Sequence, residues 1–296
     1  MNRRRFLTLA ALVAAYPAYR VVGPLIDQRR FHVNGGQLAR LKAALADPGS
    51  PLVGITFIGD SITWGTGTAQ GPNPNPRNGT LTDPRDNFAS ESYVNNVKRY
   101  IGDKYMLGSQ VSLANWRSSP SGQSIVEFSR YDSENTPQKK VRISNQGING
   151  ASTSSYMARN LLSAGDGVNY AVLPDDSFVF VQLGTNDRIE SSRNPSTQKL
   201  LADNLVALVS KVKKTSNVIL MCANPESIQS SKYLFGMDVV RSATLDAAKI
   251  CGVDFIDNYA AFEGLDLRSL IPDGIHPSVA GHSITAQNII SAIEMS

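Results

Sequence analysis

Hydrophobic residues in this chain fall into short continuous runs separated by segments with helical spacing. The continuous runs at 52–58, 178–183 and 218–222 have the length and β-branched content of buried strands. Further strands are expected at 141–145, 253–256 and 124–128. Helical spacing predicts helices at 37–46, 90–101, 154–162, 197–212, 237–250 and 278–293. Regular alternation of strands and helices is typical of a parallel sheet covered on both faces, so we expect an α/β fold.

The stretch from residue 65 to residue 140 breaks this alternation. Residues 65–88 are rich in Gly, Pro and Asn, which favours turns and extended chain, and 104–140 is irregular. The stretch has too little apolar content for a core of its own. We therefore interpret it as an irregular insertion, at about 65–140, in a single domain that spans 29–296. A long polar loop beside a reactive residue commonly shapes substrate binding.

Residues 1–28 have the pattern of an export leader. Three arginines at 3–5 precede a short apolar stretch that ends in small residues, as in a secretory signal, and they resemble the twin-arginine signal of bacteria. We expect export to the periplasm or the exterior, through the twin-arginine or the general export machinery. An uncleaved leader would be an N-terminal anchor, but Pro17, Arg20 and Pro24 interrupt it, so no stable membrane span is expected.

Composition narrows the range of partners. The chain has 296 residues, of which 42% are hydrophobic, and its formal net charge is +4. Without the three arginines at 3–5 the formal net charge is about +1, which indicates no nucleic-acid partner. No Cys or His spacing indicates a metal site, and Gly65-x-Gly67 lacks the third glycine of a dinucleotide loop, so no cofactor is expected.

The chain has two cysteines, Cys222 and Cys251. Cys222 ends one predicted strand and Cys251 precedes the next, which puts them at opposite ends of a parallel sheet. A disulfide needs Cα atoms within about 7 Å. We therefore expect two buried free thiols.

Polar residues follow the predicted strands at three places and stand in a fourth segment near the C-terminus. They include Ser61, the segment 145–153, the segment 184–187 and the segment 273–276. Because the carboxyl ends of parallel strands share one edge of a sheet, these four segments can converge there. Convergence is what a catalytic site requires.

Serine is a poor nucleophile until a base removes its proton, and histidine suits that task near neutral pH. The chain has three histidines. His276 has a carboxylate, Asp273, three residues before it, which could fix the ring tautomer that leaves the other nitrogen facing Ser61. His32 has no polar neighbours of note, and His282 is expected to be structural or exposed to solvent.

Attack on an ester creates an oxyanion, which needs preorganised hydrogen-bond donors. The candidates are the Ser61 backbone N–H, the Gly150 backbone N–H and the Asn186 side-chain amide, whose donors do not titrate. Gly147 is an alternative to Gly150. Glycine at either position would let the main chain approach a substrate closely.

In this order, the four segments resemble the four sequence blocks of the SGNH, or GDSL-type, hydrolase family. The blocks are Gly-Asp-Ser at 59–61, a glycine block at 145–150, Gly-Thr-Asn-Asp at 184–187 and Asp-x-x-His-Pro at 273–277. Each segment alone could be an ordinary turn or helix cap, but all four in the family's order favour the enzyme. The resemblance covers about 51–296.

This resemblance implies a three-layer α/β/α sandwich with a flavodoxin-like parallel sheet. It also implies a nucleophile at Ser61, a base at His276 oriented by Asp273, and oxyanion donors at Ser61, Gly150 and Asn186. The Gly-x-Ser-x-Gly elbow of α/β-hydrolases is absent, because Thr63 occupies its last position.

We therefore expect an exported serine esterase that hydrolyses acyl esters, with O-acetyl esters of carbohydrate favoured, without metal or cofactor. The substrate is a small-molecule or polysaccharide ester. Three alternatives stay open. The first is a lipase, lysophospholipase or thioesterase of the same family. The second is a polysaccharide O-acetyltransferase, and the third is a catalytically inactive polysaccharide-binding module.

Overall fold

The structure is a computed structural model. It describes residues 31–32, 35–50, 52–68, 84–85, 90–106, 110–118, 124–132, 140–158, 171–172, 175–189 and 197–296. The expected leader at 1–28 lies outside these residues, as do residues 69–83 of the predicted insertion. Within the described residues, no helix is both long enough and apolar enough to cross a membrane.

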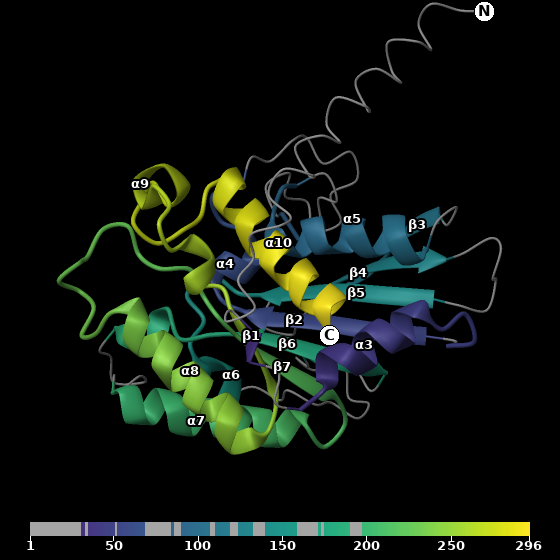
Figure 1. Cartoon of the computed structure of the whole chain (residues 1–296), viewed down its shortest axis with the longest axis horizontal. Helices are drawn as coiled ribbons and strands as arrows, with labels where there is room; N and C mark the ends of the chain where they lie inside the picture. The colour runs from purple at the N-terminus through teal and green to yellow at the C-terminus, as the bar shows by residue number, and fades with distance from the viewer. Residues whose placement is uncertain are drawn as a thin grey trace, which may run out of the picture.

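An eight-stranded sheet with the order β1-β8-β7-β6-β2-β5-β4-β3 forms the centre of the molecule (Figure 1). Its strands are β1 (Phe31–His32), β2 (Leu52–Gly59), β3 (Gln110–Ser118), β4 (Ser124–Asp132), β5 (Lys140–Gly147), β6 (Asp176–Gln182), β7 (Asn217–Cys222) and β8 (Asp254–Asp257). The strands from β8 to β5 pair in parallel, whereas β1, β4 and β3 pair antiparallel at the two sides.

The parallel strands have the flavodoxin-like order. Numbered along the chain from β2, they lie in the order 2-1-3-4-5, because β2 sits between β5 and β6. The chain leaves β2 for β5 on one side and later crosses to β6 on the other, which creates a topological switch point between β2 and β6. Open α/β sheets bind ligands at such a point, outside the carboxyl ends of the strands. The predicted fold class is confirmed.

Helices cover both faces of the sheet. They are α3 (Gln37–Ala46), α4 (Ser61–Trp64), α5 (Tyr93–Tyr105), α6 (Thr153–Met157), α7 (Gln198–Val212), α8 (Met237–Cys251), α9 (Leu267–Leu270) and α10 (Val279–Met295). On one face α10 packs against α3 and α5, and on the other α7 packs against α6 and α8 (Figure 1). Three layers result, as the alternating pattern predicts.

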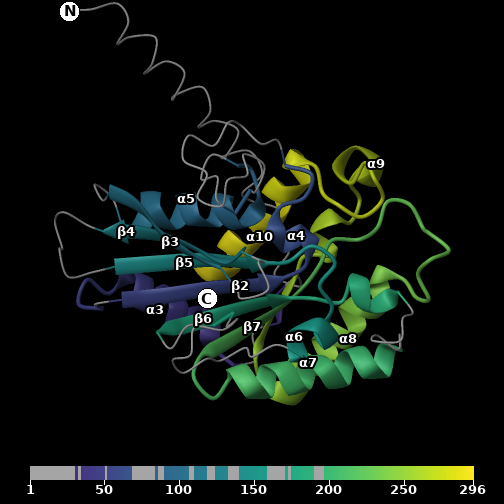
Figure 2. The ribbon, with the colours of Figure 1, turned by 180° about the vertical axis from the view of Figure 1, so that it is seen from behind.

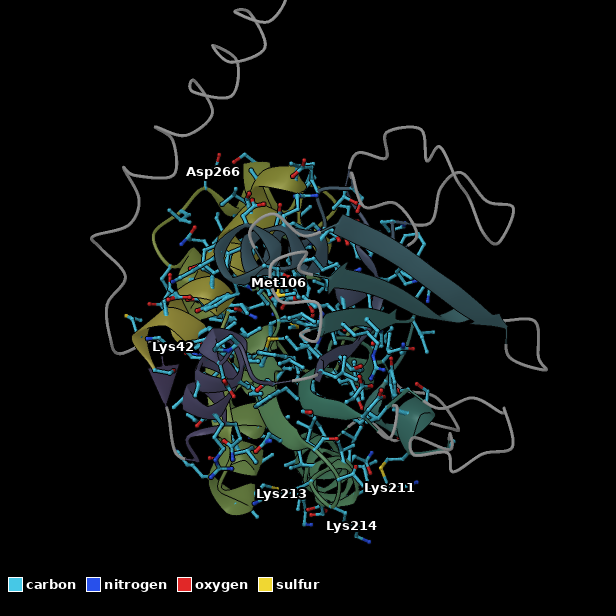
Figure 3. All side chains as sticks on the ribbon, turned by 90° about the vertical axis from the view of Figure 1, so that its right-hand side faces the viewer. Lys42, Met106, Lys211, Lys213, Lys214 and Asp266 are labelled. Carbon is cyan, nitrogen blue, oxygen red and sulfur yellow. The ribbon has the colours of Figure 1, made fainter. Side chains whose placement is uncertain are left out.

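The core follows from the continuous apolar runs. Every residue of β2 after Leu52 is buried, because the strand has helices on both faces. Phe57 of β2 stacks on Phe180 of β6 with ring centroids 4.7 Å apart. Seen from the side, side chains fill the space between the sheet and both helical layers, and Lys42 of α3 donates to the Glu294 carbonyl near the end of α10 (Figure 3).

A buried charged cluster lies at the amino ends of β5 and β6. Arg142 Nη2 is 2.7 Å from Asp176 Oδ1, and Arg142 also pairs with Asp175. Thr56 Oγ1 donates to Asp176 Oδ2 at 2.7 Å. Since these residues come from β2, β5 and the start of β6, the cluster joins three neighbouring strands near the edge opposite the carboxyl ends.

The predicted insertion contains more regular structure than its sequence indicates. The strand expected at 124–128 runs to Asp132, and β3, which was not predicted, pairs with it antiparallel. β3 lies at the side of the sheet, and Gln, Ser, Asn and Arg interrupt its apolar residues, which hides the strand signal. Part of the insertion therefore extends the sheet.

Several helix boundaries also differ from the prediction. The helix expected at 90–101 begins after the N-cap Ser92 and runs to Tyr105. The helix expected at 154–162 is observed as α6, with 159–162 outside the described residues. The short helices α4 and α9 were not predicted, because four residues carry no periodic signal.

Both cysteines are free, as predicted, but only one is buried. Cys222 lies inside the sheet, whereas Cys251 is partly exposed at the last position of α8. The expectation of two buried thiols was wrong for Cys251, because the end of the helix reaches the surface.

Candidate active site

Ser61 lies at the carboxyl end of β2, beside the switch point of the sheet. It is the first residue of α4, and Asp60 is the N-cap, whose Oδ1 accepts a hydrogen bond from the Ile62 N–H at 2.9 Å. The first amides of a helix have no intrahelical acceptor, so the Ser61 N–H can serve a ligand. The Ser61 carbonyl accepts from Gly65 and Thr66, which holds the following turn against the serine.

Ser61, His276 and Asp273 form a continuous hydrogen-bonded series. Ser61 Oγ is 2.8 Å from His276 Nε2, and His276 Nδ1 is 2.6 Å from Asp273 Oδ2. An ionised carboxylate only accepts, so Nδ1 carries the proton and Nε2 accepts from the Ser61 hydroxyl. Ser61 is 8% exposed and the His276 side chain 25% exposed, so both side chains are largely buried but reach the surface.

Asp273 is held in its position by the turn that it begins. Its Oδ1 accepts from the Ile275 N–H at 2.9 Å and the His276 N–H at 2.7 Å. Partial burial raises the pKa of Asp273, but these hydrogen bonds and that from the His276 ring outweigh burial, so the pKa is lowered overall. Asp273 is therefore a carboxylate at neutral pH.

The Asn186 amide lies beside the glycine segment. Asn186, which follows β6, donates from Nδ2 to the Ala151 carbonyl at 2.9 Å, and this bond fixes the orientation of the amide. Ala151 follows Gly150, whose φ of +74° favours glycine. No acceptor for the Gly150 N–H is found among the residues that the structure describes. By contrast, the Gly147 N–H donates to Asn145 Oδ1 at 2.9 Å, so Gly150 is the better candidate donor.

Hydrogen bonds connect the glycine segment to the serine segment. The Ile148 N–H donates to the Gly59 carbonyl at 3.0 Å, and Thr66 Oγ1 donates to Asn149 Oδ1 at 3.3 Å. The sequence blocks around Ser61, Gly150, Asn186 and His276 thus lie side by side at the carboxyl edge of the sheet.

Asp60 and His282 are buried titratable residues near this edge that were not assigned a chemical role from the sequence. Burial raises the pKa of Asp60 to about 6, against the opposing effect of its hydrogen bonds. Gln182 Nε2 lies 3.4 Å from both Asp60 carboxylate oxygens. An Asp-Ser pair at a strand end gives no sequence signal of this burial.

His282 is structural, which was one of the two expectations for it. It is fully buried: Nδ1 accepts from the Tyr93 N–H at 3.3 Å, and Nε2 donates to the Thr66 carbonyl at 3.0 Å. Burial lowers the pKa of His282 to about 4, so the ring is neutral near pH 7. It thereby supports the turn that follows the serine helix. Within the described ranges, no group of three His, Cys, Asp or Glu side chains could hold a metal ion.

A flavodoxin-like sheet with serine, histidine and aspartate in hydrogen-bonded series at its carboxyl edge defines a serine hydrolase that acts on carboxylic esters. The chain belongs to the GDSL-like lipase/acylhydrolase family, which matches residues 100–284. This match contains Asn186, Asp273 and His276, and Ser61 precedes it. No curated protein matches the chain significantly.

Solved structures with the same fold include esterases. A peptidoglycan O-acetylesterase is 12% identical, with a TM-score of 0.56, over 88% of this chain and 95% of the other. A lipase/acylhydrolase from Enterococcus faecalis is 18% identical, with a TM-score of 0.54, over 82% of this chain and 96% of the other. At such identities the likeness concerns the fold.

Proposed function

We propose that this acylhydrolase is an exported serine esterase that removes O-acetyl groups from carbohydrate through an acyl-enzyme on Ser61. The observation that carries the proposal is the hydrogen bond between Ser61 Oγ and His276 Nε2, 2.8 Å long, with Asp273 on the other ring nitrogen. A serine so placed has a base within reach and a carboxylate that orients the base.

Acylation begins when Ser61 Oγ attacks the ester carbonyl and its proton passes to His276 Nε2. The resulting oxyanion accepts hydrogen bonds from the Ser61 N–H, the Gly150 N–H and the Asn186 amide. Collapse of the tetrahedral intermediate breaks the bond to the alcohol, and His276 returns its proton to the leaving oxygen. The Asp273 carboxylate stabilises the imidazolium that exists between these two transfers.

Deacylation repeats these steps with water. His276 takes a proton from a water molecule that attacks the acyl-enzyme carbonyl, and the same donors stabilise the second oxyanion. When this intermediate collapses, Ser61 Oγ recovers the proton from His276 and acetate leaves. These steps use only groups of this chain and water.

Three observations support the substrate class and the export. A structure of the same fold is that of a peptidoglycan O-acetylesterase, which favours a carbohydrate ester. The sequence of residues 65–88 is polar and rich in Asn and Pro, without a long apolar stripe for a fatty acyl chain. The arginines at 3–5 and the apolar stretch after them support export.

A chain-length series tests the acyl group. p-Nitrophenyl esters from acetate to palmitate are compared by kcat/KM, beside an acetylated polysaccharide from which released acetate is measured. We expect the acetate ester to be the best of the series and the polysaccharide to release acetate. Highest activity on long acyl chains would instead indicate a lipase and contradict the proposal.

The Ser61→Ala variant tests the nucleophile, with Ser242→Ala as its matched control. Ser242 is exposed, and its hydroxyl bonds only the Asp238 carbonyl among the residues that the structure describes, so its removal should leave activity unchanged. Ser61→Ala should lower kcat by about 10³-fold or more. A folded wild-type protein that binds polysaccharide without cleaving any ester would be a binding module. Acetylated product from an added sugar acceptor would identify a transferase.

A further inference from the structure

Arg188 is fully buried, although it immediately follows the segment that carries Asn186. Its Nε donates to the Thr185 carbonyl at 3.1 Å, and its Nη1 lies 2.7 Å from Glu226 Oε2. The guanidinium carbon is 3.8 Å from the centroid of the Tyr233 ring, which is a cation–π distance. Burying a charge is costly, and these contacts offset part of that cost.

Two partners of Arg188, Glu226 and Tyr233, belong to one connecting segment, residues 223–236, between β7 and α8. Glu226 lies near its start and Tyr233 near its end. In addition, the Leu234 N–H donates to the Arg188 carbonyl at 3.0 Å. Arg188 therefore holds both ends of this segment, which projects beyond the sheet between α8 and α9 (Figure 2).

The start of the same segment, on both sides of Glu226, contacts the turn that carries Asp273 and His276. The Ser227 N–H donates to the Gly274 carbonyl at 3.1 Å, and Asn224 Nδ2 donates to the Ile275 carbonyl at 3.1 Å. The Ser227 hydroxyl donates to the Ile271 carbonyl. Among the described residues, every hydrogen bond that reaches 271–275 from outside 266–278 comes from Asn224 or Ser227.

We infer that Arg188 is a positioning residue that acts through residues 223–236 to hold the Asp273 and His276 turn in register with Ser61. The inference rests on the proposed function, because register matters only if His276 takes the proton of Ser61. The Asp273 side chain is 54% exposed, so its position depends on the hydrogen bonds of the turn more than on its own burial. Since Asn186 lies two residues before Arg188, the contacts of Arg188 with residues 223–236 also connect the Asn186 amide to the turn that carries His276.

The first test replaces Arg188 by lysine. Lysine keeps the charge but loses the planar fork and the stacking on Tyr233. We expect kcat on p-nitrophenyl acetate to fall by about tenfold to a hundredfold, because small displacements of reacting groups are costly, with KM changed by less than about threefold. The rate at which a fluorophosphonate labels Ser61 should fall by the same factor, and it requires no knowledge of the natural substrate.

Arg241→Lys is the matched control. Arg241 pairs with Asp257 at 2.6 Å and lies 5.3 Å from the Tyr259 ring centroid, so it loses the same kinds of contact. Its partners do not include residues 223–236 or 271–276. We expect labelling within about twofold of the wild-type rate, a factor that corresponds to less than 1 kcal/mol. Melting temperatures of both variants show how much each destabilises the fold.

Asn224→Ala removes the hydrogen bond from residues 223–236 to the Ile275 carbonyl and leaves Arg188 in place. It should also slow labelling, and the double variant with Arg188→Lys should be scarcely slower than Arg188→Lys alone, because both act through one turn. If Arg188→Lys does not fold, Asn224→Ala alone decides. The inference is overturned if Asn224→Ala labels at the wild-type rate, or if Arg241→Lys slows labelling as much as Arg188→Lys. A wild-type protein that is not labelled would overturn the proposed function itself.

Discussion

Ser61 Oγ and His276 Nε2 lie 2.8 Å apart, although 215 positions separate the two residues in the chain. Ser61 reaches this point at the end of β2, and His276 reaches it from the turn before α10. Their meeting depends on the sheet, which gathers the carboxyl ends of its parallel strands at one edge. Four predictions follow from this geometry and from the buried groups beneath it.

Asp273→Asn should lower kcat by about 10²- to 10⁴-fold. An asparagine can still accept from the Ile275 and His276 N–H groups, but its amide nitrogen can donate to His276 Nδ1. The ring then carries its proton on Nε2 and cannot accept the proton of Ser61. The measurement is kcat on p-nitrophenyl acetate near pH 7.5. Asp266→Asn, which alters an exposed N-cap of α9, is the control and should keep full activity.

Asn186→Ala should lower kcat by about 10- to 10³-fold with little change in KM, because the amide is proposed to bond the oxyanion more strongly than the ground-state carbonyl. Asn186→Asp should be worse than Asn186→Ala, since a carboxylate repels the oxyanion. Steady-state kinetics of both variants on one acetate ester provide the check. An effect confined to KM would mean that Asn186 only binds substrate.

His282 should make the fold less stable as the pH falls from 6.5 to 4. Burial lowers its pKa to about 4 from the ordinary 6.5, so within this window the unfolded chain binds a proton that the folded chain does not. The free energy of unfolding therefore decreases with decreasing pH, by about 3 kcal/mol for the full window. Urea unfolding at several pH values should show a smaller decrease in His282→Gln. Equal decreases in both proteins would contradict the assignment.

Asp60 should act in the opposite direction. Burial raises its pKa from 3.8 to about 6, so between these values the folded chain binds a proton that the unfolded chain does not. The free energy of unfolding contributed by Asp60 therefore decreases as the pH rises through the window. Asp60→Asn removes this titration and can keep the bond from the Ile62 N–H. Relative to wild type, its free energy of unfolding should increase between pH 4 and pH 7, which urea unfolding measures.

The parallel strands β2, β6 and β7 could be predicted because each is a largely continuous apolar run, which is typical of a strand covered on both faces. Alternation with helices indicated β5 and β8. Proximity of Ser61, Asp273 and His276 could also be predicted, since each belongs to a motif at the end of a predicted strand or just before a predicted helix. These inferences need only local pattern and the rule that parallel strands end together. They do not need the contacts of any particular side chain.

The remaining features depend on contacts between distant residues. β3 is an edge strand with interrupted apolar residues, so it has no pattern of its own and is defined by pairing with β4. Arg188 looks like an ordinary polar residue after a strand, and only its contact with Glu226, 38 positions later, shows that it is buried and paired. Burial of His282 likewise depends on α10 packing against α5.

The ion pair between Arg142 and Asp176 lies near the amino ends of the strands, far along the sheet from the serine. The residues that hold the central strands together and the residues proposed to carry out the chemistry therefore lie at opposite edges of the sheet. Loops at the carboxyl edge of the sheet can change in length and composition during evolution, while the buried charged cluster at the opposite edge keeps the strands aligned. This separation would allow the fold to acquire new ester specificities while the contacts that stabilise its sheet stay unchanged.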